Sequence, residues 1–283
     1  MRKNNAIFLL LICSILIFSF SCKRKTPPIT IIPEALKNHL QRARLFENVK
    51  SVEIHTYYYS DQDSVFVFYD KNLQYYNSEG YLTEEITLDK NNDTLSKKII
   101  FFLPNTNENY WLENNYKNLS IIKDTLIYDK NGFKSEEHFL LNDSLLYKIQ
   151  YKTDAIGSII EMKRFLPEYQ LVNKIYYNAQ GLVERIEEFD PENKLYKFVT
   201  IEYDQYGNEL NRCVYDNANR LIEYTYTQYN KGALQKIIYN DALSNLREDK
   251  IYARHDAARN WLEELTMQGR DTLRKRVRTI AYY

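Results

Sequence analysis

The sequence predicts an all-β protein, an antiparallel meander of about eight β-hairpin repeats of roughly 26 residues each. We expect the meander to form a coiled or partly closed, elongated sheet, preceded by one short N-terminal helix. Three observations predict this fold. The chain has 26 tyrosines but only 7 glycines among 283 residues. A short phrase that ends in glycine recurs at a fixed spacing, and the segments between the copies alternate polar residues with β-branched and aromatic ones.

Residues 1–21 are predicted to be a lipoprotein signal peptide. Arg2 and Lys3 precede an apolar run that is shorter than the roughly 20 residues needed to span a bilayer. Ser21 and Cys22 end this segment in a way that resembles the lipobox of bacterial lipoproteins. The resemblance implies that Cys22 carries the lipid anchor and becomes the mature N-terminus. An uncleaved anchor and an ordinary secretory signal are the alternatives.

The resemblance also implies a location and a first partner. We expect the protein in the bacterial cell envelope, attached to a membrane through its N-terminal lipid, with the outer membrane favoured and the membrane face left open. The chain has 38 basic and 38 acidic residues and no basic stripe, so we expect no nucleic-acid partner. A protein or a glycan remains as the possible second partner.

Two short segments separate the anchor from the repeats. Residues 22–32 include Pro27 and predict a tether. Residues 33–48 predict a short helix or cap, because Leu36 and Leu40 recur at helical spacing.

Residues 49–283 are predicted to form the repeat domain. Each copy of the repeat has an Asp or Asn at the same position, directly after an aromatic or polar residue. These residues are Asp129, Asp154, Asn178, Asp204, Asn230 and Asp256. The phrase ends in a glycine in most copies, which predicts a turn. The turn glycines are Gly80, Gly132, Gly157, Gly181, Gly207 and Gly232.

A second turn lies near the middle of each period, as at Asp190-Pro191 and Asp216-Asn217. Two turns in each period leave strands of about eight residues, so the unit is a hairpin. Asn tolerates positive φ best after glycine, and we expect it to replace glycine at Asn193, Asn219 and Asn260. The last strand would be a sheet edge, guarded by the charges of Arg274, Arg276 and Arg278.

The Tyr-Asp-x-x-Gly pattern, clearest at Tyr203-Asp204 and repeated as Tyr215-Asp216, resembles the YD repeats of RHS-type bacterial proteins. The closing stretch from Arg259 to Tyr283 resembles the end of small YD-repeat lipoproteins of Gram-negative envelopes. In large RHS proteins such repeats form a shell around a toxin, and here we expect neither a toxin domain after the repeats nor a shell of that size. MORN-type hairpin repeats are a second, weaker resemblance.

No motif for catalysis, for a cofactor or for a metal ion is present, so we expect a non-catalytic protein with no cofactor and no metal site. Neighbouring carboxylates such as Glu136 and Glu137 occupy adjacent strand positions, which face opposite sides of a sheet. They cannot converge on one substrate atom. Cys213 has no histidine beside it and is expected to be a buried structural thiol.

The aromatic residues are the remaining candidates for binding. Tyrosines on both strand faces can cover a thin core, and this is the interpretation we favour. Alternatively, Trp111 or Trp261 contributes to an exposed aromatic strip. We therefore expect a lipid-anchored binding or scaffolding module. A carbohydrate-binding lipoprotein is the first alternative, and an enzyme with an unrecognised site is the second.

Overall fold

The computed structural model of the protein describes residues 45, 47–61, 63–102 and 108–283. All of them belong to one compact unit that spans Ile32–Tyr283. The signal peptide, Cys22, the tether and residues 33–44 of the predicted helix or cap lie outside the described residues. The helix prediction is wrong for Leu45, Glu47 and Asn48, the described residues of the predicted range 33–48, because none of them is helical. Within the described part of the chain there is no helix.

The described residues form a single antiparallel sheet of eighteen strands. Their bounds are β1 Val49–Ser60, β2 Val65–Tyr76, β3 Leu82–Asp89, β4 Thr94–Phe102, β5 Glu108–Asn115, β6 Ser120–Tyr128, β7 Lys134–Leu141, β8 Ser144–Thr153, β9 Ile159–Phe165, β10 Gln170–Tyr177, β11 Val183–Phe189, β12 Leu195–Tyr203, β13 Glu209–Asp216, β14 Leu221–Asn230, β15 Ala233–Asp241, β16 Leu246–His255, β17 Trp261–Gln268 and β18 Asp271–Tyr282.

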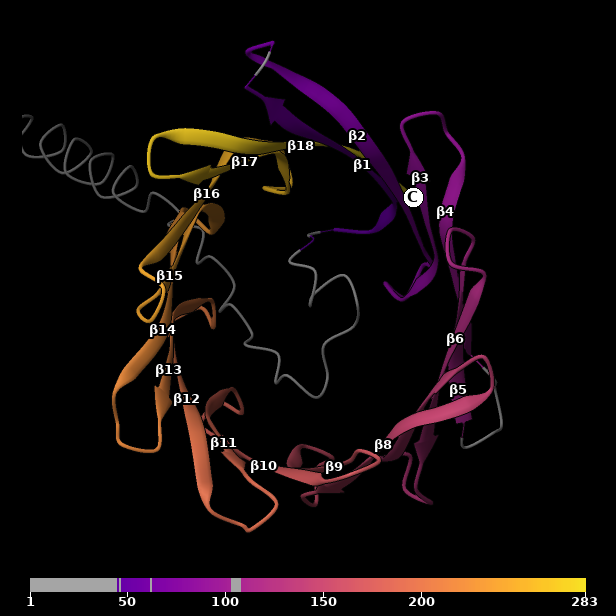
Figure 1. Ribbon diagram of the computed structural model, residues 1–283, viewed down its shortest axis with the longest axis vertical. Coiled ribbons are helices and arrows are strands. Elements are labelled where there is room, and N and C mark those ends of the chain that lie inside the picture. The colour runs from indigo at the N-terminus through magenta and orange to yellow at the C-terminus, as the bar shows by residue number, and fades with distance from the viewer. Residues whose placement is uncertain (1–44, 46, 62, 103–107) are drawn as a thin grey trace, which may run out of the picture. The chain divides into compact units, whose positions relative to one another are not determined.

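Each strand pairs with the next one along the chain, and the last strand pairs with the first. β1 is therefore bonded on both sides: Ile54 is opposite Asn72 of β2 and opposite Arg278 of β18. The strands follow one another around a ring (Figure 1). Tyr283 strengthens this junction, because its amide donates to the Asn48 carbonyl at 3.1 Å and its hydroxyl donates to the Tyr76 carbonyl.

The prediction of a coiled or partly closed sheet is therefore wrong, since the eighteen described strands close completely into a barrel. The predicted guard role of Arg274, Arg276 and Arg278 is wrong for the same reason. These residues lie on β18, which has a neighbouring strand on each side and is not an edge.

The recurring phrase forms one kind of turn, in which an Asp or Asn side chain bonds the backbone. At Asp129, the side-chain Oδ1 accepts from the amides of Asn131 and Phe133, at 2.8 and 2.9 Å. The Gly132 amide donates to the Asp129 carbonyl at 3.0 Å. The same bonds recur at Asn77, Asp154, Asn178 and Asp204, and also in the second turns at Asp89, Asp190 and Asp216.

All of these turns need one residue with positive φ. Glycine supplies it in the first turns, and Asn193 and Asn219 supply it in the second turns, each with φ of 61°. These two predicted substitutions for glycine are confirmed. The third is wrong, because in the last copy Arg259 adopts a φ of 73° and Asn260 does not have positive φ.

The wall of the barrel, which is the closed sheet itself, has two faces that differ in burial. The strand register shows on which face each residue lies, because directly opposed residues share a face. Nearly all the buried residues within the strands fall on one face, which we call the inner face because side chains converge on the concave side of a closed sheet. They include Val52, Thr56, Asp124, Ile149, Ile201, Thr227, Tyr252, Glu264 and Thr266. Phe198, which is also buried, lies on the outer face under the guanidinium of Arg185.

No single core fills the closed sheet in its described part. Buried apolar side chains gather in two small clusters, one of Leu45, Val49, Val52 and Tyr76, the other of Leu234, Tyr252 and Trp261. Most strand residues on both faces are only half-buried. An eighteen-strand ring is too wide for its inward side chains to meet across the axis.

The turns should make unequal contributions to stability, and two glycines allow a matched test. A Cβ at Gly157 would meet the ring of Phe133 at 2.7 Å, whereas a Cβ at Gly132 would meet nothing within 4 Å. Both residues have positive φ, at 89° and 79°. We expect Gly132→Ala to lower the free energy of unfolding by about 1 kcal/mol through backbone strain alone. Gly157→Ala should lower it by about 2–4 kcal/mol, because the clash adds to the strain. Urea denaturation measures both, and equal losses would contradict the close approach of Phe133.

Candidate functional site

A cluster of titratable side chains lies on the inner face of β6, β7 and β8, and we call it the carboxyl cluster: Asp124, Glu137, Lys134 and Tyr151. Asp124 is opposite Phe139, two residues from Glu137. The two carboxyl groups are thus diagonal neighbours across adjacent strands. Asp124 is only 5% exposed.

The two carboxyl groups have different hydrogen-bond partners. The Trp111 indole Nε1 donates to Asp124 Oδ2 at 2.9 Å, and Oδ1 of Asp124 is buried with no partner among the described residues. Glu137 is better supplied, since Lys134 Nζ lies 2.7 Å from its Oε2 and the Tyr151 hydroxyl donates to the same oxygen.

These surroundings separate the pKa values of the pair. Burial raises the pKa of Asp124 to about 7, and the adjacent Glu137 carboxyl reinforces the rise. Burial acts in the same direction on Glu137, but the hydrogen bonds from Lys134 and Tyr151 bring its pKa below the ordinary value. Asp124 is therefore the carboxyl group of the pair that holds a proton more readily, and Glu137 is the one that ionises more readily.

A row of stacked rings and cations crosses the same inner face, and we call it the aromatic row. The Lys98 ammonium lies 3.8 Å from the centroid of Trp111, and Trp111 meets Phe139 edge-on at 5.9 Å. Phe139 stacks on Tyr147 at 4.8 Å, and the Arg164 guanidinium lies 5.7 Å from Tyr147. The row spans β4 to β9 and joins the carboxyl cluster at Trp111.

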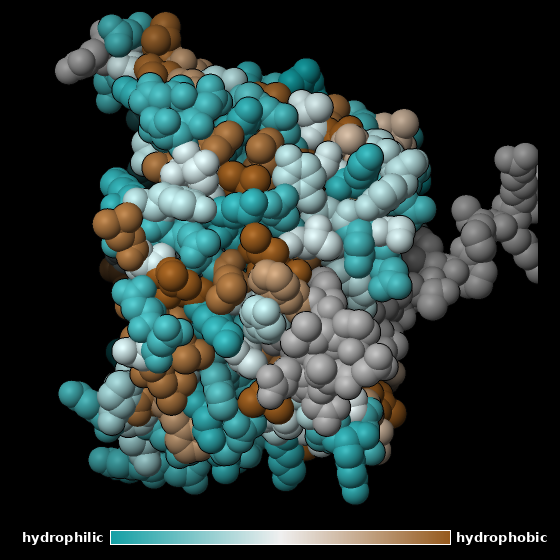
Figure 2. All heavy atoms as spheres, turned by 90° about the vertical axis from the view of Figure 1, so that its right-hand side faces the viewer, coloured by the Kyte–Doolittle hydropathy of each residue, from teal (hydrophilic) through white to brown (hydrophobic). Residues whose placement is uncertain are grey.

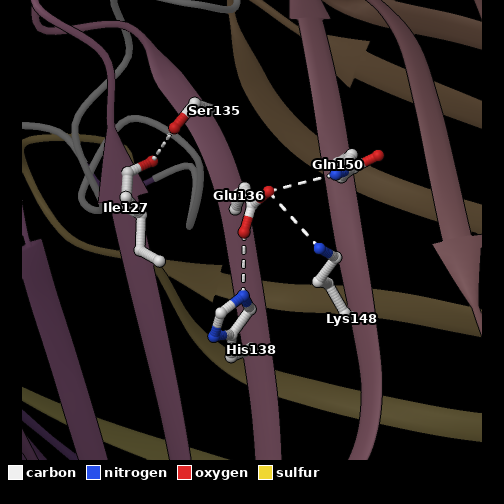
Figure 3. A network of polar contacts seen from close by, with 6 residues as sticks. All are labelled: Ile127, Ser135, Glu136, His138, Lys148 and Gln150. Atoms are coloured by element: carbon white, nitrogen blue, oxygen red, sulfur yellow. Dashed lines mark hydrogen bonds and ion pairs between the residues drawn. The ribbon is translucent and has the colours of Figure 1, made fainter.

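The outer face of the same strands carries charges in close pairs. Glu136, next to Glu137 in sequence, lies 2.9 Å from His138 Nε2, 3.4 Å from Lys148 Nζ and 3.1 Å from Gln150 Nε2 (Figure 3). Neighbouring carboxylates thus do face opposite sides of the wall. The sequence analysis does not predict the contact between Glu137 and Asp124. This contact depends on strand register, which spacing along the chain does not reveal.

The two predicted tryptophans lie far apart on the ring, on β5 and β17. Trp261 is 7% exposed, and its ring contacts the Arg278 guanidinium at 3.5 Å and Tyr252 at 5.5 Å between centroids. Trp111 is half-buried under Lys98. The binding role expected for these residues stays a prediction, as does the lipid at Cys22, which lies outside the described residues.

The other candidates lie apart from the carboxyl cluster. Cys213 is a free thiol on the outer face, and it is half-buried where we predicted it buried. His55 pairs with Glu53 at 2.6 Å, and His255 lies 2.6 Å from the Leu234 carbonyl. Among the described residues, no group of three His, Cys, Asp or Glu side chains is placed to hold a metal ion.

No protein-family model and no curated protein matches this sequence. Among solved structures, a porin-like protein from Bacteroides uniformis matches 82% of this chain and 96% of its own, with 13% identity and a TM-score of 0.44. The TcdB2–TccC3 complex without its hypervariable C-terminal region matches 77% of this chain at 10% identity and a TM-score of 0.32. The Photorhabdus luminescens Tc holotoxin pore matches 80%, at 10% identity and a TM-score of 0.29.

The two toxin structures are matched over only 15% and 16% of their chains. At these identities and TM-scores we transfer no role from any of the three proteins. The resemblance to YD repeats therefore stays a prediction. In the described part of the chain, no helix has the length and apolar character needed to cross a membrane.

The raised pKa of Asp124 predicts how stability depends on pH. The folded protein holds the Asp124 proton more tightly than the unfolded chain, in which the pKa of Asp124 is near 3.8. The free energy of unfolding therefore falls as the pH rises from about 4 to about 7. Asn mimics the protonated acid and can still accept from Trp111. We expect Asp124→Asn to be more stable than the wild type at about pH 8, with the difference shrinking towards about pH 5.

Asp249→Asn provides the control, measured by urea denaturation at both pH values. Hydrogen bonds from Arg247 and Lys236 lower the pKa of Asp249, so its contribution is already complete above its ordinary pKa. Its effect should hardly change across the interval. A constant difference between Asp124→Asn and the wild type would contradict the assignment to Asp124.

Proposed function

We propose that this protein is a non-catalytic binding or scaffolding module of the bacterial cell envelope, held at a membrane by lipid on Cys22. The ring of strands stands in water, and its inner face meets the ligand. The observation that carries the proposal is the aromatic row on the inner face, which runs beside the carboxyl cluster.

The outer face supports a position in water. Barrel walls that face lipid present a continuous apolar band to it. Here the outer face carries ion pairs around the ring, including Lys97–Glu84 at 2.7 Å, Lys148–Glu136 at 3.4 Å, Arg185–Glu187 at 2.9 Å, Lys236–Asp249 at 2.7 Å and Arg254–Glu263 at 3.0 Å. On the side shown in Figure 2, hydrophilic and hydrophobic residues are interspersed.

The inner face supports a binding role. It combines the aromatic row with the polar groups of the carboxyl cluster on the same face. By contrast, a depression of about 260 Å³ on the outer face is lined by charged side chains such as Glu161, Lys163 and Lys174.

A carbohydrate is the second candidate ligand, and the aromatic row is the observation that favours it. Aromatic rings next to carboxyl and amide groups can stack on the apolar face of a sugar while the polar groups bond its hydroxyls. The row at Trp111, Phe139 and Tyr147 supplies three rings within the four consecutive strands β5 to β8.

The anchor predicts where the protein is found after cell fractionation. Cys22→Ala should move the protein from the membrane fraction to the soluble fraction, because the acyl chains supply about 0.8 kcal/mol of membrane affinity for each buried methylene. Metabolic labelling with a palmitate analogue should label the wild type and leave the variant unlabelled. A Cys22→Ala protein that stays in the membrane fraction would refute the anchor.

The binding role can be tested on a glycan array with two variants of neighbouring residues. Trp111 faces inward, whereas Tyr110 faces outward and stacks on Phe101 at 4.7 Å. We expect any glycan bound by the wild type to be lost by Trp111→Ala and kept by Tyr110→Ala, with circular dichroism confirming that both variants fold. If the wild type binds no glycan on the array, the carbohydrate proposal is wrong. If both variants lose binding equally, the aromatic row is not the binding site.

A further inference from the structure

Three arginines occupy alternate positions of β18, at Arg274, Arg276 and Arg278, and we call them the arginine ladder. The register places all three on the inner face, because Arg276 is opposite Thr56 and Glu264. Alternate residues of a strand are about 6–7 Å apart, so the three guanidinium groups form a row along one strand. The residues between them, Lys275 and Val277, face outward.

The ladder has too few acceptors among the described residues. Glu264 is the carboxylate in ion-pair range of it, with Oε1 at 3.6 Å from both Arg274 Nη2 and Arg276 Nη1. Arg274 Nη2 also donates to Thr266 Oγ1 at 3.2 Å. Three buried donors have no acceptor among the residues that the structure describes: Nε of Arg274, and Nε and Nη1 of Arg278. Three cations thus share one acid.

The neighbouring strands add few charges to balance the ladder. On β16, Lys250 is already paired with Glu248 at 3.3 Å. On the far side of β1, Glu85 of β3 accepts from Asn72 and Gln74 of β2. Arg278 stacks on Trp261, which holds its guanidinium in place without neutralising it. The excess of positive charge therefore stays at β18.

We propose that the arginine ladder is an anion-binding site for a phosphate- or carboxylate-bearing ligand on the inner face of β18. The planar fork of donors on Arg matches both kinds of group in bidentate fashion. The incoming anion would take the free donors and compete with Glu264 for Arg274 and Arg276. This site deepens the proposed function, on which it rests for the inner face as the side that meets the ligand.

Titration calorimetry of the full chain with two probes, inorganic phosphate and citrate, tests the site. We expect saturable binding of at least one probe, and the comparison between them identifies phosphate or carboxylate as the preferred group. Arg276→Gln should weaken that binding roughly tenfold or more, because it removes a charge-assisted contact. Arg276 is the variant of choice because its side chain is 35% exposed, which makes a folding defect less damaging than at Arg278.

The matched control is Lys275→Gln, which removes the same charge from the next residue on the outer face, where Lys275 lies 3.6 Å from Glu263. Its effect on binding should be within about twofold, since the outer charge is screened by solvent. Glu264→Gln should tighten binding severalfold, because it removes the competing carboxylate. Thermal unfolding confirms that each variant is folded.

Three results would overturn the site: no saturable binding of either probe, equal weakening by Arg276→Gln and Lys275→Gln, or weaker binding in a folded Glu264→Gln protein. A blank glycan array or a failed Cys22 anchor leaves these readouts unchanged. Failure of the anion site is therefore distinguishable from failure of the proposed function.

Discussion

The pairing of β1 with both β2 and β18 is the constraint on which the rest of the structure depends. Every other described strand pairs with its neighbours in sequence, which would by itself leave an open meander with two edges. The junction of β1 and β18 removes both edges. It also determines which side chains of each strand point into the ring and which point outward.

Closure at this width has a consequence for how the protein is stabilised. An eighteen-strand ring cannot fill its centre with its own side chains, so burial is spread thinly over two faces and two small clusters. Stability then depends on local features. These are cross-strand pairs such as Phe198 stacked on Tyr215, and turns whose Asp or Asn side chains bond the backbone. The many tyrosines suit a half-buried wall, because their rings pack while their hydroxyls reach water or an acceptor.

What the sequence predicts well is local, and what it misses depends on pairing between distant residues. The turn at Asp129 to Gly132 and the positive φ of Asn193 follow from the preferences of a few adjacent residues. Closure joins residues more than two hundred positions apart, as at Ile54 and Arg278, and no local pattern signals it. The meeting of Asp124 with Glu137 and the inward direction of the arginine ladder follow only once register and closure are known. Even so, alternation alone correctly places Glu136 and Glu137 on opposite faces.

The most direct test of this account is a cross-link across the closing junction. Tyr57 of β1 and Lys275 of β18 are opposite each other on the outer face, so cysteines at these two positions should be joined by oxidation within one molecule. Lys97, on the outer face of β4, replaces Lys275 in the control pair. In dilute protein whose native cysteines are replaced by alanine, we expect rapid intramolecular linkage of Tyr57→Cys with Lys275→Cys and none with Lys97→Cys. Equal linkage in both pairs, or linkage only between molecules, would contradict the closed sheet.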